Sequence, residues 1–549
     1  MRISPSVLPF ILSLSMVLAA EPAAGAAGDL DPSFGVGGKV ITRFEPIGGR
    51  AAALVIQPDG KIVAAGVVPR SGGSDFTLVR YLPDGTLDAS FGSGGIVTTV
   101  FPGRSSEVTA LALQPDGKIV AAGKVSGAGH LQEDFGLARY HPDGSLDTGF
   151  GSGGLVTTDF GGFDLAEGVA LLPDGRIAVA GTRIVGQFHD FAVALYESNG
   201  SASAGFGAGG RVVTDFFGRD DVARDVLAQP DGRIVAVGYA FSPVATRVAL
   251  ARYNLDGSLD PSFSGDGKAT TSDSILSSEL GFAAALQPDG RIVVAGSRIS
   301  GANFNFLVER YLPNGSPDTS FGTGGWATLD FFGEQDEAHA VALQPGGGIV
   351  LAGFARNGPD FVDYDFALAR YTPGGLLDTS FGAAGRVTTD FFGLTDQGYA
   401  AASQPDGRIV VAGYATEPDP SRIGQFALAR YLGAVNAPPV ITGVSASRTT
   451  LWPPNHKMID VTVFYSVTDD RDPAPLCALS VTSNEPVNGT GDGDTAPDWQ
   501  VVDAHRVRLR AERSGGGSGR VYTIVITCQD GDGASARQMV TVSVPRSAK

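Results

Sequence analysis

The sequence is poor in cysteine and in charged residues, and it has no long apolar run beyond its first residues. Only 2 of its 549 residues are cysteine, too few for a four-thiolate zinc site. Charged residues make up 18% of the chain. After the N-terminal segment, no stretch approaches the roughly 18–20 apolar residues that span a bilayer. These absences exclude a zinc ribbon and predict no membrane span.

The charge that is present is mostly negative, with a formal net charge of −18. A net-acidic surface repels the phosphates of nucleic acids and of anionic lipids, so neither is expected as a partner. Hydrophobic residues reach 43%, enough to form a large core rather than a disordered chain. The 77 glycines suit short strands joined by tight turns.

Motifs of common enzyme families are also missing. The six histidines form no H-E-x-x-H pair for zinc. Neither a G-x-S-x-G nucleophile motif nor a P-loop is present. The sequence therefore indicates no catalytic centre and implies no cofactor.

The N-terminus has the pattern of an export signal. Arg2 precedes an apolar stretch at 7–18, and Ala24-Gly25-Ala26 offers a cleavage site. This predicts a signal peptide over 1–26 and a mature protein that is secreted, periplasmic or attached to the cell surface. In such an oxidising compartment, Cys477 and Cys528 are expected to form a disulfide.

Internal repetition is the strongest signal in the chain. A turn close to Gln-Pro-Asp-Gly recurs seven times, with its prolines at Pro58, Pro115, Pro173, Pro230, Pro288, Pro345 and Pro405. A second marker, the phenylalanine of a Ser-Phe-Gly-like segment, recurs at Phe34, Phe91, Phe150, Phe206, Phe263, Phe321 and Phe381. Because each marker occurs seven times, the chain is expected to contain seven copies of one unit of about 58 residues.

Each unit holds four short strand-like runs and no helical periodicity. In the second unit these runs are 111–113, 118–123, 135–140 and 155–160, separated by Pro-Asp-Gly and Gly-rich turns. Four antiparallel strands per unit form a propeller blade, and small residues in the first run suit strands that converge on an axis. The sequence thus predicts an all-β fold, a seven-bladed β-propeller over 29–432.

The two ends of the repeat region complement each other. A strand-like run at 39–44 precedes the first full unit, and the last unit stops after its third run at 426–431. If the N-terminal run supplies the missing fourth strand, the ring closes and no strand edge stays exposed. An open solenoid has no use for this match.

The units resemble the bacterial delta-60 repeat family. The segments that carry the resemblance are 404–413, 366–371 and 377–382, and it extends over roughly 29–432. It implies an exported bacterial propeller of unestablished function, and it offers no catalytic residues to transfer to this chain.

The repeat disappears after a linker at 433–439. The segment 440–549 contains seven strand candidates with apolar residues at alternate positions. This pattern predicts a small β-sandwich that resembles the immunoglobulin-like modules of bacterial secreted proteins, with the cysteine pair on its inward face.

Recurring acids are the main candidates for a site. Nine positions before the turn proline, five of the seven units carry Asp164, Asp221, Glu279, Asp336 or Asp396. One interpretation is a ring of carboxylates at the channel mouth that binds calcium or a cationic ligand. The other is that each carboxylate accepts hydrogen bonds from loop amides, and recurrence in most blades favours this structural role.

A recurring arginine and two histidines could likewise have either a structural or a ligand-binding role. An arginine recurs in six units, at Arg80, Arg139, Arg252, Arg310, Arg370 and Arg430, whereas the third unit has Leu195. We expect it to form an inter-blade salt bridge or stacking contact, with Asp159, Asp215, Asp330 or Asp390 as candidate partners. His189 and His339 fall where they could face the channel, but isolated surface histidines are the simpler interpretation.

Taken together, the pattern predicts a secreted, non-catalytic binding or scaffold protein that is monomeric. Its ligand, an extracellular protein or polysaccharide, is expected on the propeller face that carries the loops of variable length. Two alternatives stay open. One is a glycan-active or quinone-dependent enzyme with its site at the channel mouth, and the other is a structural component of the envelope or matrix.

Overall fold

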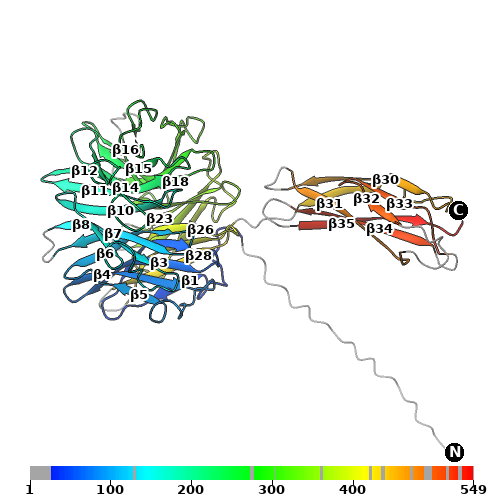
Figure 1. Ribbon diagram of the computed structural model, residues 1–549, viewed down its shortest axis with the longest axis horizontal. Coiled ribbons are helices and arrows are strands. Elements are labelled where there is room, and N and C mark those ends of the chain that lie inside the picture. Colours follow the sequence, from blue (N-terminus) through cyan, green and yellow to red (C-terminus); the bar gives the residue numbers. More distant parts are fainter. Residues whose placement is uncertain are drawn as a thin grey trace, which may run out of the picture.

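The computed structural model describes residues 26–547 except 128–131, 272–276, 302, 359–362, 419–422, 434–438, 470–473, 488–496, 515–518 and 530–534. The expected signal peptide therefore lies outside the described residues, apart from its last residue, Ala26. The described residues contain 35 β-strands and no helix (Figure 1). The all-β class predicted from the sequence is confirmed.

Strands β1–β28 form seven four-stranded blades, in which the chain runs from the innermost strand to the outermost. The innermost strands are β2 (Arg50–Ile56), β6 (Ser105–Leu113), β10 (Phe163–Leu171), β14 (Asp221–Ala228), β18 (Ser278–Leu286), β22 (Asp336–Leu343) and β26 (Asp396–Ser403). The second strands are β3 (Ile62–Arg70), β7 (Ile119–Ser126), β11 (Ile177–Val185), β15 (Ile234–Phe241), β19 (Ile292–Ser300), β23 (Ile349–Arg356) and β27 (Ile409–Thr416). The third strands are β4 (Gly73–Tyr81), β8 (Glu133–Tyr140), β12 (Phe188–Tyr196), β16 (Thr246–Tyr253), β20 (Asn303–Tyr311), β24 (Tyr364–Tyr371) and β28 (Gly424–Tyr431). The outermost strands are β5 (Ile96–Thr99), β9 (Leu155–Thr158), β13 (Arg211–Thr214), β17 (Lys268–Thr270), β21 (Trp326–Leu329), β25 (Arg386–Thr389) and β1 (Lys39–Thr42).

The ring closes as the sequence predicts. β1 pairs antiparallel with β28, from Lys39 opposite Ala429 to Thr42 opposite Phe426, and so completes the seventh blade. The innermost strands β2 and β26 are in contact, as are the other neighbouring pairs around the ring. The seven-bladed propeller closed by an N-terminal strand is therefore confirmed.

The core is divided among the seams between blades. Each seam buries apolar side chains from two neighbouring sheets, as where Phe135 and Val120 of one blade pack with Ala166 and Val179 of the next. The third strands contribute near-continuous apolar runs, because the blades cover both of their faces. Burial on both faces fixes the register of each blade.

In five blades the recurring arginine donates a hydrogen bond to a carbonyl of the next blade, but its carboxylate partner differs from the one expected. Arg252 bonds Asp260 of its own blade, with Nε 2.8 Å from Oδ2, stacks on Phe263 and donates to the carbonyl of Pro313 in the next blade at 2.6 Å. In the six blades its ion pair is with Asp88, Asp147, Asp260, Asp318, Asp378 or Asp31, in place of the expected Asp159, Asp215, Asp330 or Asp390. Antiparallel pairing explains the error, because those residues follow the outermost strand at the end of the blade opposite to the arginine.

One blade carries a buried carboxyl where the others have alanine or valine. Glu309 in β20 is 3% exposed, and Tyr311 donates a hydrogen bond of 2.6 Å to it. Burial raises the pKa of Glu309 to about 8, with Glu279 adding to the rise and Arg298 opposing it. The folded protein therefore holds this carboxyl protonated at neutral pH.

Glu309→Gln is expected to remove a loss of stability that builds up as pH rises from about 5 to about 8. Because the folded pKa is raised, the contribution of Glu309 is fully present below its unfolded pKa of roughly 4.3 and is lost as pH rises through about 8. In urea unfolding, the free energy of unfolding of the variant relative to that of wild type should rise by about 2–4 kcal/mol from pH 5 to pH 9. The exposed Glu45→Gln serves as the control, and an equal difference at both pH values for Glu309→Gln would contradict the assignment.

Strands β29–β35 form a two-layered sandwich, drawn orange to red in Figure 1. One sheet has the order β29-β30-β33-β32 and the other β31-β34-β35. Their bounds are β29 (Val440–Ala446), β30 (Met458–Thr468), β31 (Leu476–Ser483), β32 (Trp499–Val501), β33 (Arg506–Arg510), β34 (Arg520–Gln529) and β35 (Ser535–Val544). Alternate residues of β30 and β34, such as Val461, Val463, Ile524 and Ile526, are buried between the sheets. The alternation seen in the sequence thus marks the inward faces.

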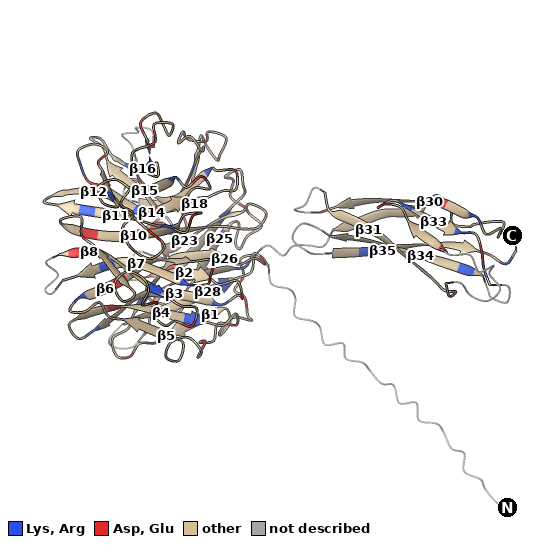
Figure 2. Cartoon of the chain, viewed as in Figure 1, with Lys and Arg blue, Asp and Glu red and all other residues tan. Residues whose placement is uncertain are grey.

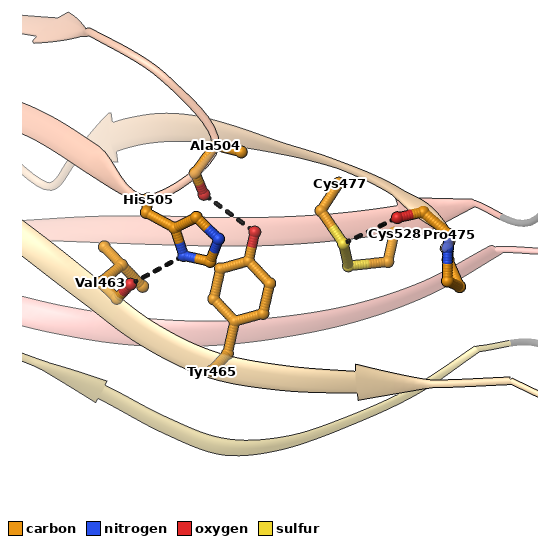
Figure 3. The surroundings of a disulfide bond; sticks show 7 residues. All are labelled: Val463, Tyr465, Pro475, Cys477, Ala504, His505 and Cys528. Carbon is orange, nitrogen blue, oxygen red and sulfur yellow. Dashed lines mark hydrogen bonds between the residues drawn. A yellow bond between two sulfur atoms is a disulfide. The ribbon is translucent and has the colours of Figure 1, made fainter. Parts of the chain in front are cut away.

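The predicted disulfide is confirmed. Cys477 and Cys528 lie opposite each other on β31 and β34, so the bond joins neighbouring strands of one sheet. In the same region Tyr465 donates to the carbonyl of Ala504 at 2.9 Å, and its ring stacks on His505 (Figure 3). The bond closes a segment of 51 residues, which limits the freedom of the unfolded sandwich.

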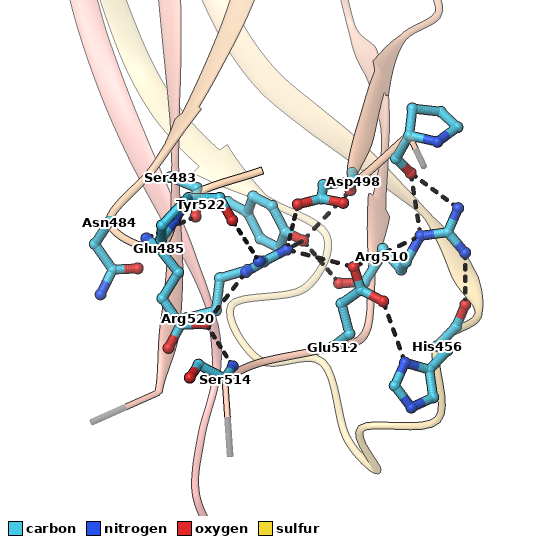
Figure 4. Close-up of polar contacts among 12 residues, drawn as sticks. His456, Ser483, Asn484, Glu485, Asp498, Arg510, Glu512, Ser514, Arg520 and Tyr522 are labelled. Carbon is cyan, nitrogen blue, oxygen red and sulfur yellow. Dashed lines mark hydrogen bonds and ion pairs between the residues drawn. The ribbon is translucent and has the colours of Figure 1, made fainter. Parts of the chain in front are cut away.

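A buried cation lies at the other end of β34. Arg520 is completely buried, with Nη1 2.7 Å from Asp498 and 3.6 Å from Glu512, while Nε is 3.4 Å from Glu485 (Figure 4). Burial disfavours its charge, but Tyr522 and the carboxylates raise the pKa of Arg520 well above its usual value. One guanidinium is therefore shared by three buried acids.

Candidate functional site

The seven innermost strands enclose a central channel. It contains a cavity of about 670 Å³ with residues of all seven blades in its wall. A cavity of this size is within the range of small-molecule sites in proteins. The channel is therefore the first place to look for a ligand site.

Every innermost strand carries a β-bulge at the same position. The pairing with the second strand skips one residue, as between Ala223 and Asp225 in β14. The bulged residues are Ala52, Thr109, Glu167, Arg224, Phe282, His339 and Tyr399, and all of them line the cavity. A bulge re-aims a side chain without changing the rest of the ladder. Each blade thus presents a different residue to the channel from an identical backbone feature.

Charged side chains occupy one part of the channel wall. Arg224 Nη1 lies 3.1 Å from Glu167, and Glu107 lies 3.4 Å from Arg50 and 3.3 Å from Lys124. Burial raises the pKa of Glu167, and Arg224, Lys124 and Arg50 act against that rise. These groups form a chain of alternating sign across the first four blades.

Aromatic side chains occupy the remaining part. The His339 ring stacks on Phe282 with 4.7 Å between centroids, and Tyr399 meets it edge-on at 5.2 Å. Phe354 packs against His339 at 5.2 Å, and Tyr239 lines the wall next to Phe282. The channel therefore has a charged side from blades 1–4 and an aromatic side from blades 4–7.

Glu337 connects the two sides. His339 Nε2 lies 3.1 Å from its carboxylate, and Gln335 donates a hydrogen bond of 2.6 Å to it. Burial alone would raise the pKa of Glu337, but the bonds from His339 and Gln335 and the charge of Arg224 hold it below its usual value. Glu337 is thus an ionised acceptor at the boundary of the aromatic side.

The five acids predicted from the sequence do not line this cavity. Each lies at a junction between two blades, and Asp164, Asp221, Asp336 and Asp396 are completely buried. In these four, one carboxylate oxygen accepts the amide of the phenylalanine after the outermost strand of the preceding blade: Phe160, Phe216, Phe331 and Phe391, at 2.5–2.7 Å. They make the loop-amide bonds that their recurrence suggested, and they form no ring at the channel mouth.

Glu279 has different partners from the other four. It lies 3.7 Å from Arg247 and 3.8 Å from Arg298, and Thr271 donates a hydrogen bond of 2.8 Å to it. Arg247 is completely buried. This junction therefore has a built-in positive charge.

The four aspartates are strongly perturbed. Burial raises the pKa of Asp164 to about 6, of Asp221 and Asp336 to about 7 and of Asp396 to about 8. Nearby carboxylates add to each rise. In Figure 2 acidic segments appear on β8 and β10, two of the strands that meet at one such junction.

The two candidate histidines differ. His339 lies in the channel among aromatic rings, so the interpretation as an isolated surface histidine is wrong for it. His189 lies in β12, where its amide donates to Asp220 at 3.2 Å, and it does not line the cavity. Repetition in the sequence does not identify the channel residues, because the position six before the turn proline carries a different residue in every unit.

The closed ring of four-stranded sheets defines a seven-bladed β-propeller protein. A family model described as a domain of unknown function (DUF5122) beta-propeller matches seven segments, at 57–91, 114–150, 172–206, 229–263, 287–321, 344–381 and 404–432. One matched segment falls in each of the seven blades, so the repeats of this propeller are similar to those of that family.

The solved structures that match this chain do so at low sequence identity and low TM-score. Virginiamycin B lyase from Staphylococcus aureus is 10% identical with a TM-score of 0.40, over 71% of this chain and 98% of that one. The polysaccharide lyase Uly1 is 11% identical with a TM-score of 0.40, over 72% and 91%. Sqt1 from Chaetomium thermophilum is 14% identical with a TM-score of 0.35, over 72% and 97%. No curated protein matches the chain. Among the residues that the structure describes, no helix has the length and apolar character needed to cross a membrane.

Proposed function

We propose that this chain is a secreted, non-catalytic binding protein whose ligand site is the central channel. The observation that carries the proposal is the set of bulged residues, one per blade and all different, which meet in a single cavity. A residue needed only for folding recurs from blade to blade, as the arginine does. Side chains that differ at one fixed position are suited to specify a ligand.

The wall chemistry fits the end of an uncharged saccharide. Phe282 and Tyr399 offer apolar faces to the C–H side of a sugar ring, while Glu337 and Arg224 offer hydrogen-bond partners for its hydroxyl groups. The cavity is lined by three Lys or Arg side chains and four carboxyls, so it exerts little net attraction on a highly charged ligand. A neutral polysaccharide of the extracellular medium meets both conditions.

The rest of the chain supports a role outside the cell. The disulfide indicates an oxidising compartment. The sandwich sheets, in the orders β29-β30-β33-β32 and β31-β34-β35, have the strand order of constant-type immunoglobulin domains. In this proposal the sandwich is an immunoglobulin-like accessory module that acts as an adhesive or spacer, and the propeller is of the delta-60 repeat type.

Arg224→Ala and Tyr399→Ala are expected to weaken saccharide binding at least tenfold. Each substitution removes a group of the cavity wall, and loss of about 1.4 kcal/mol of binding free energy lowers affinity tenfold. Isothermal titration with a panel of neutral, uronic-acid and glucosamine oligosaccharides measures the effect.

Arg176→Ala is the matched control. Arg176 does not line the cavity, and it pairs with the exposed Asp174 of its own turn. Its loss should leave the affinity unchanged. If all three variants bind the same oligosaccharide as tightly as wild type does, the ligand site is not in the channel.

A glycan-active enzyme is the second candidate, and two channel carboxyls favour it. The pKa of Glu167 is raised, as a general acid requires, whereas Glu337 is held ionised. Arg224 interacts electrostatically with both. Release of reducing ends from an oligosaccharide by wild-type protein, but not by Glu167→Gln, would replace the non-catalytic proposal with this one.

A further inference from the structure

Three blade junctions bring three aspartates together. The triads are Asp134, Asp159 and Asp164 between blades 2 and 3, Asp190, Asp215 and Asp221 between blades 3 and 4, and Asp365, Asp390 and Asp396 between blades 6 and 7. In each triad, one carboxylate oxygen of every member lies within 4.8 Å of the others. The first member lies on the third strand, the second follows the outermost strand, and the third lies on the innermost strand of the next blade.

Buried oxygens without a hydrogen-bond partner lie in all three triads. These atoms are Oδ1 of Asp164, Oδ1 of Asp221 and Oδ1 of Asp365. The three side chains are at most 3% exposed. Burying a carboxylate oxygen without a partner is costly unless a cation or a donor compensates it. The amide bonds to Asp164 and Asp221 use the other oxygen, so the structural role leaves one ligand atom free in each.

Two of the four remaining junctions show what the place of the first aspartate contains when the triad is absent. Between blades 4 and 5, Arg247 replaces the first aspartate, and its guanidinium lies 3.7 Å from Glu279. Between blades 7 and 1, Gln425 takes that place and accepts the amide of Phe44 at 2.9 Å. A junction therefore folds without carboxylates, and one junction places a positive charge beside its acid.

We propose that each aspartate triad binds one Ca²⁺ ion between two blades. Carboxylate oxygens are the ligands that Ca²⁺ prefers, at about 2.3–2.6 Å, so oxygens on opposite sides of the ion lie about 4.6–5.2 Å apart. The oxygens of each triad lie within 4.8 Å of one another, close enough for one ion to contact all three.

The triad of blades 6 and 7 is the clearest of the three. Arg104 pairs with Asp134, and Arg183 lies 3.9 Å from Asp190, so the other two triads already have a basic neighbour. Among the described residues, no Lys or Arg forms an ion pair with the carboxylates of Asp365, Asp390 or Asp396. An ion at this junction would join the last two blades of the ring.

Calcium titration of the full chain tests the proposal. After EDTA treatment and desalting, isothermal titration to about 5 mM Ca²⁺ should show three ions per chain, since extracellular sites bind at about 0.1–1 mM. Calcium should also raise the melting temperature above that in EDTA, because it binds the folded state. Asp396→Asn and Asp365→Asn should each lower the count to two.

Asp336→Asn is the matched control. Asp336 has the same place on its strand, the same amide bond and an unpartnered buried Oδ1 as well, but it belongs to no triad of carboxylates. It should keep three bound ions. Wild-type protein that takes up no Ca²⁺ and melts at the same temperature in calcium and in EDTA would overturn the proposal. Three ions retained in both Asp396→Asn and Asp365→Asn would overturn it as well.

Discussion

Deletion of residues 29–44 is expected to abolish the cooperative unfolding of the propeller. The segment contains β1, the buried Phe34 and Asp31, which pairs with the buried Arg430 at 2.8 Å. Losing a buried phenylalanine costs roughly 3–5 kcal/mol, and leaving a buried charge unpaired costs a similar amount. Together these approach the roughly 5–15 kcal/mol by which native domains are stable. Scanning calorimetry should show the propeller transition lost.

Point variants separate ring closure from mere shortening of the chain. Phe34→Ala removes a side chain that is 0% exposed, whereas Val36→Ala alters one that is 86% exposed. The first should lower the melting temperature and the second should not. A deletion variant that melts like the intact protein would show that β1 does not close the ring.

Arg520→Met is expected to destabilise the sandwich by about 3–5 kcal/mol. The substitution leaves Asp498, Glu485 and Glu512 buried with their shared cation removed, and breaking a buried ion pair from one side costs about that much. Urea unfolding followed by circular dichroism measures the change. The effect should exceed that of any exposed ion pair in the chain.

Arg508→Met provides the comparison on the same sandwich. Arg508 pairs with Asp460 at 2.9 Å, but both side chains are largely exposed. Water screens such a pair, so its loss should cost no more than about 1 kcal/mol. If Arg520→Met is as mild as Arg508→Met, the buried cluster does not stabilise the fold.

The architecture was predictable because its signals are repeated. The turn proline and the Phe marker recur in seven copies, and the unmatched runs at both ends of the repeat region predict how the ring closes. Partners of individual side chains were harder to predict. Arg80 bonds Asp88 across a turn of its own blade, eight residues away, and the repeat pattern alone does not distinguish that carboxylate from others in the unit.

The channel site was not predictable by the same argument. A site to which each blade gives one different residue leaves no recurring motif, and the bulge that aims Glu167 or His339 inward is a backbone feature without a sequence mark of its own. The sequence predicted the junction triads only in part. Asp396 recurs in register with other acids, but its neighbours Asp365 and Asp390 come from elsewhere in the preceding repeat, so only the pairing of blades brings them together.

The bulge in each innermost strand separates selection for the folded blade from selection for the binding surface. The ladder on either side of the bulge keeps its backbone pairing whether the bulged residue is Ala52 or Tyr399, so exchange at this position leaves the blade intact. Duplication of one repeat could therefore be followed by divergence of the binding surface one blade at a time. The propeller is in this sense a fixed frame with seven interchangeable positions, on which new specificities can evolve without a new fold.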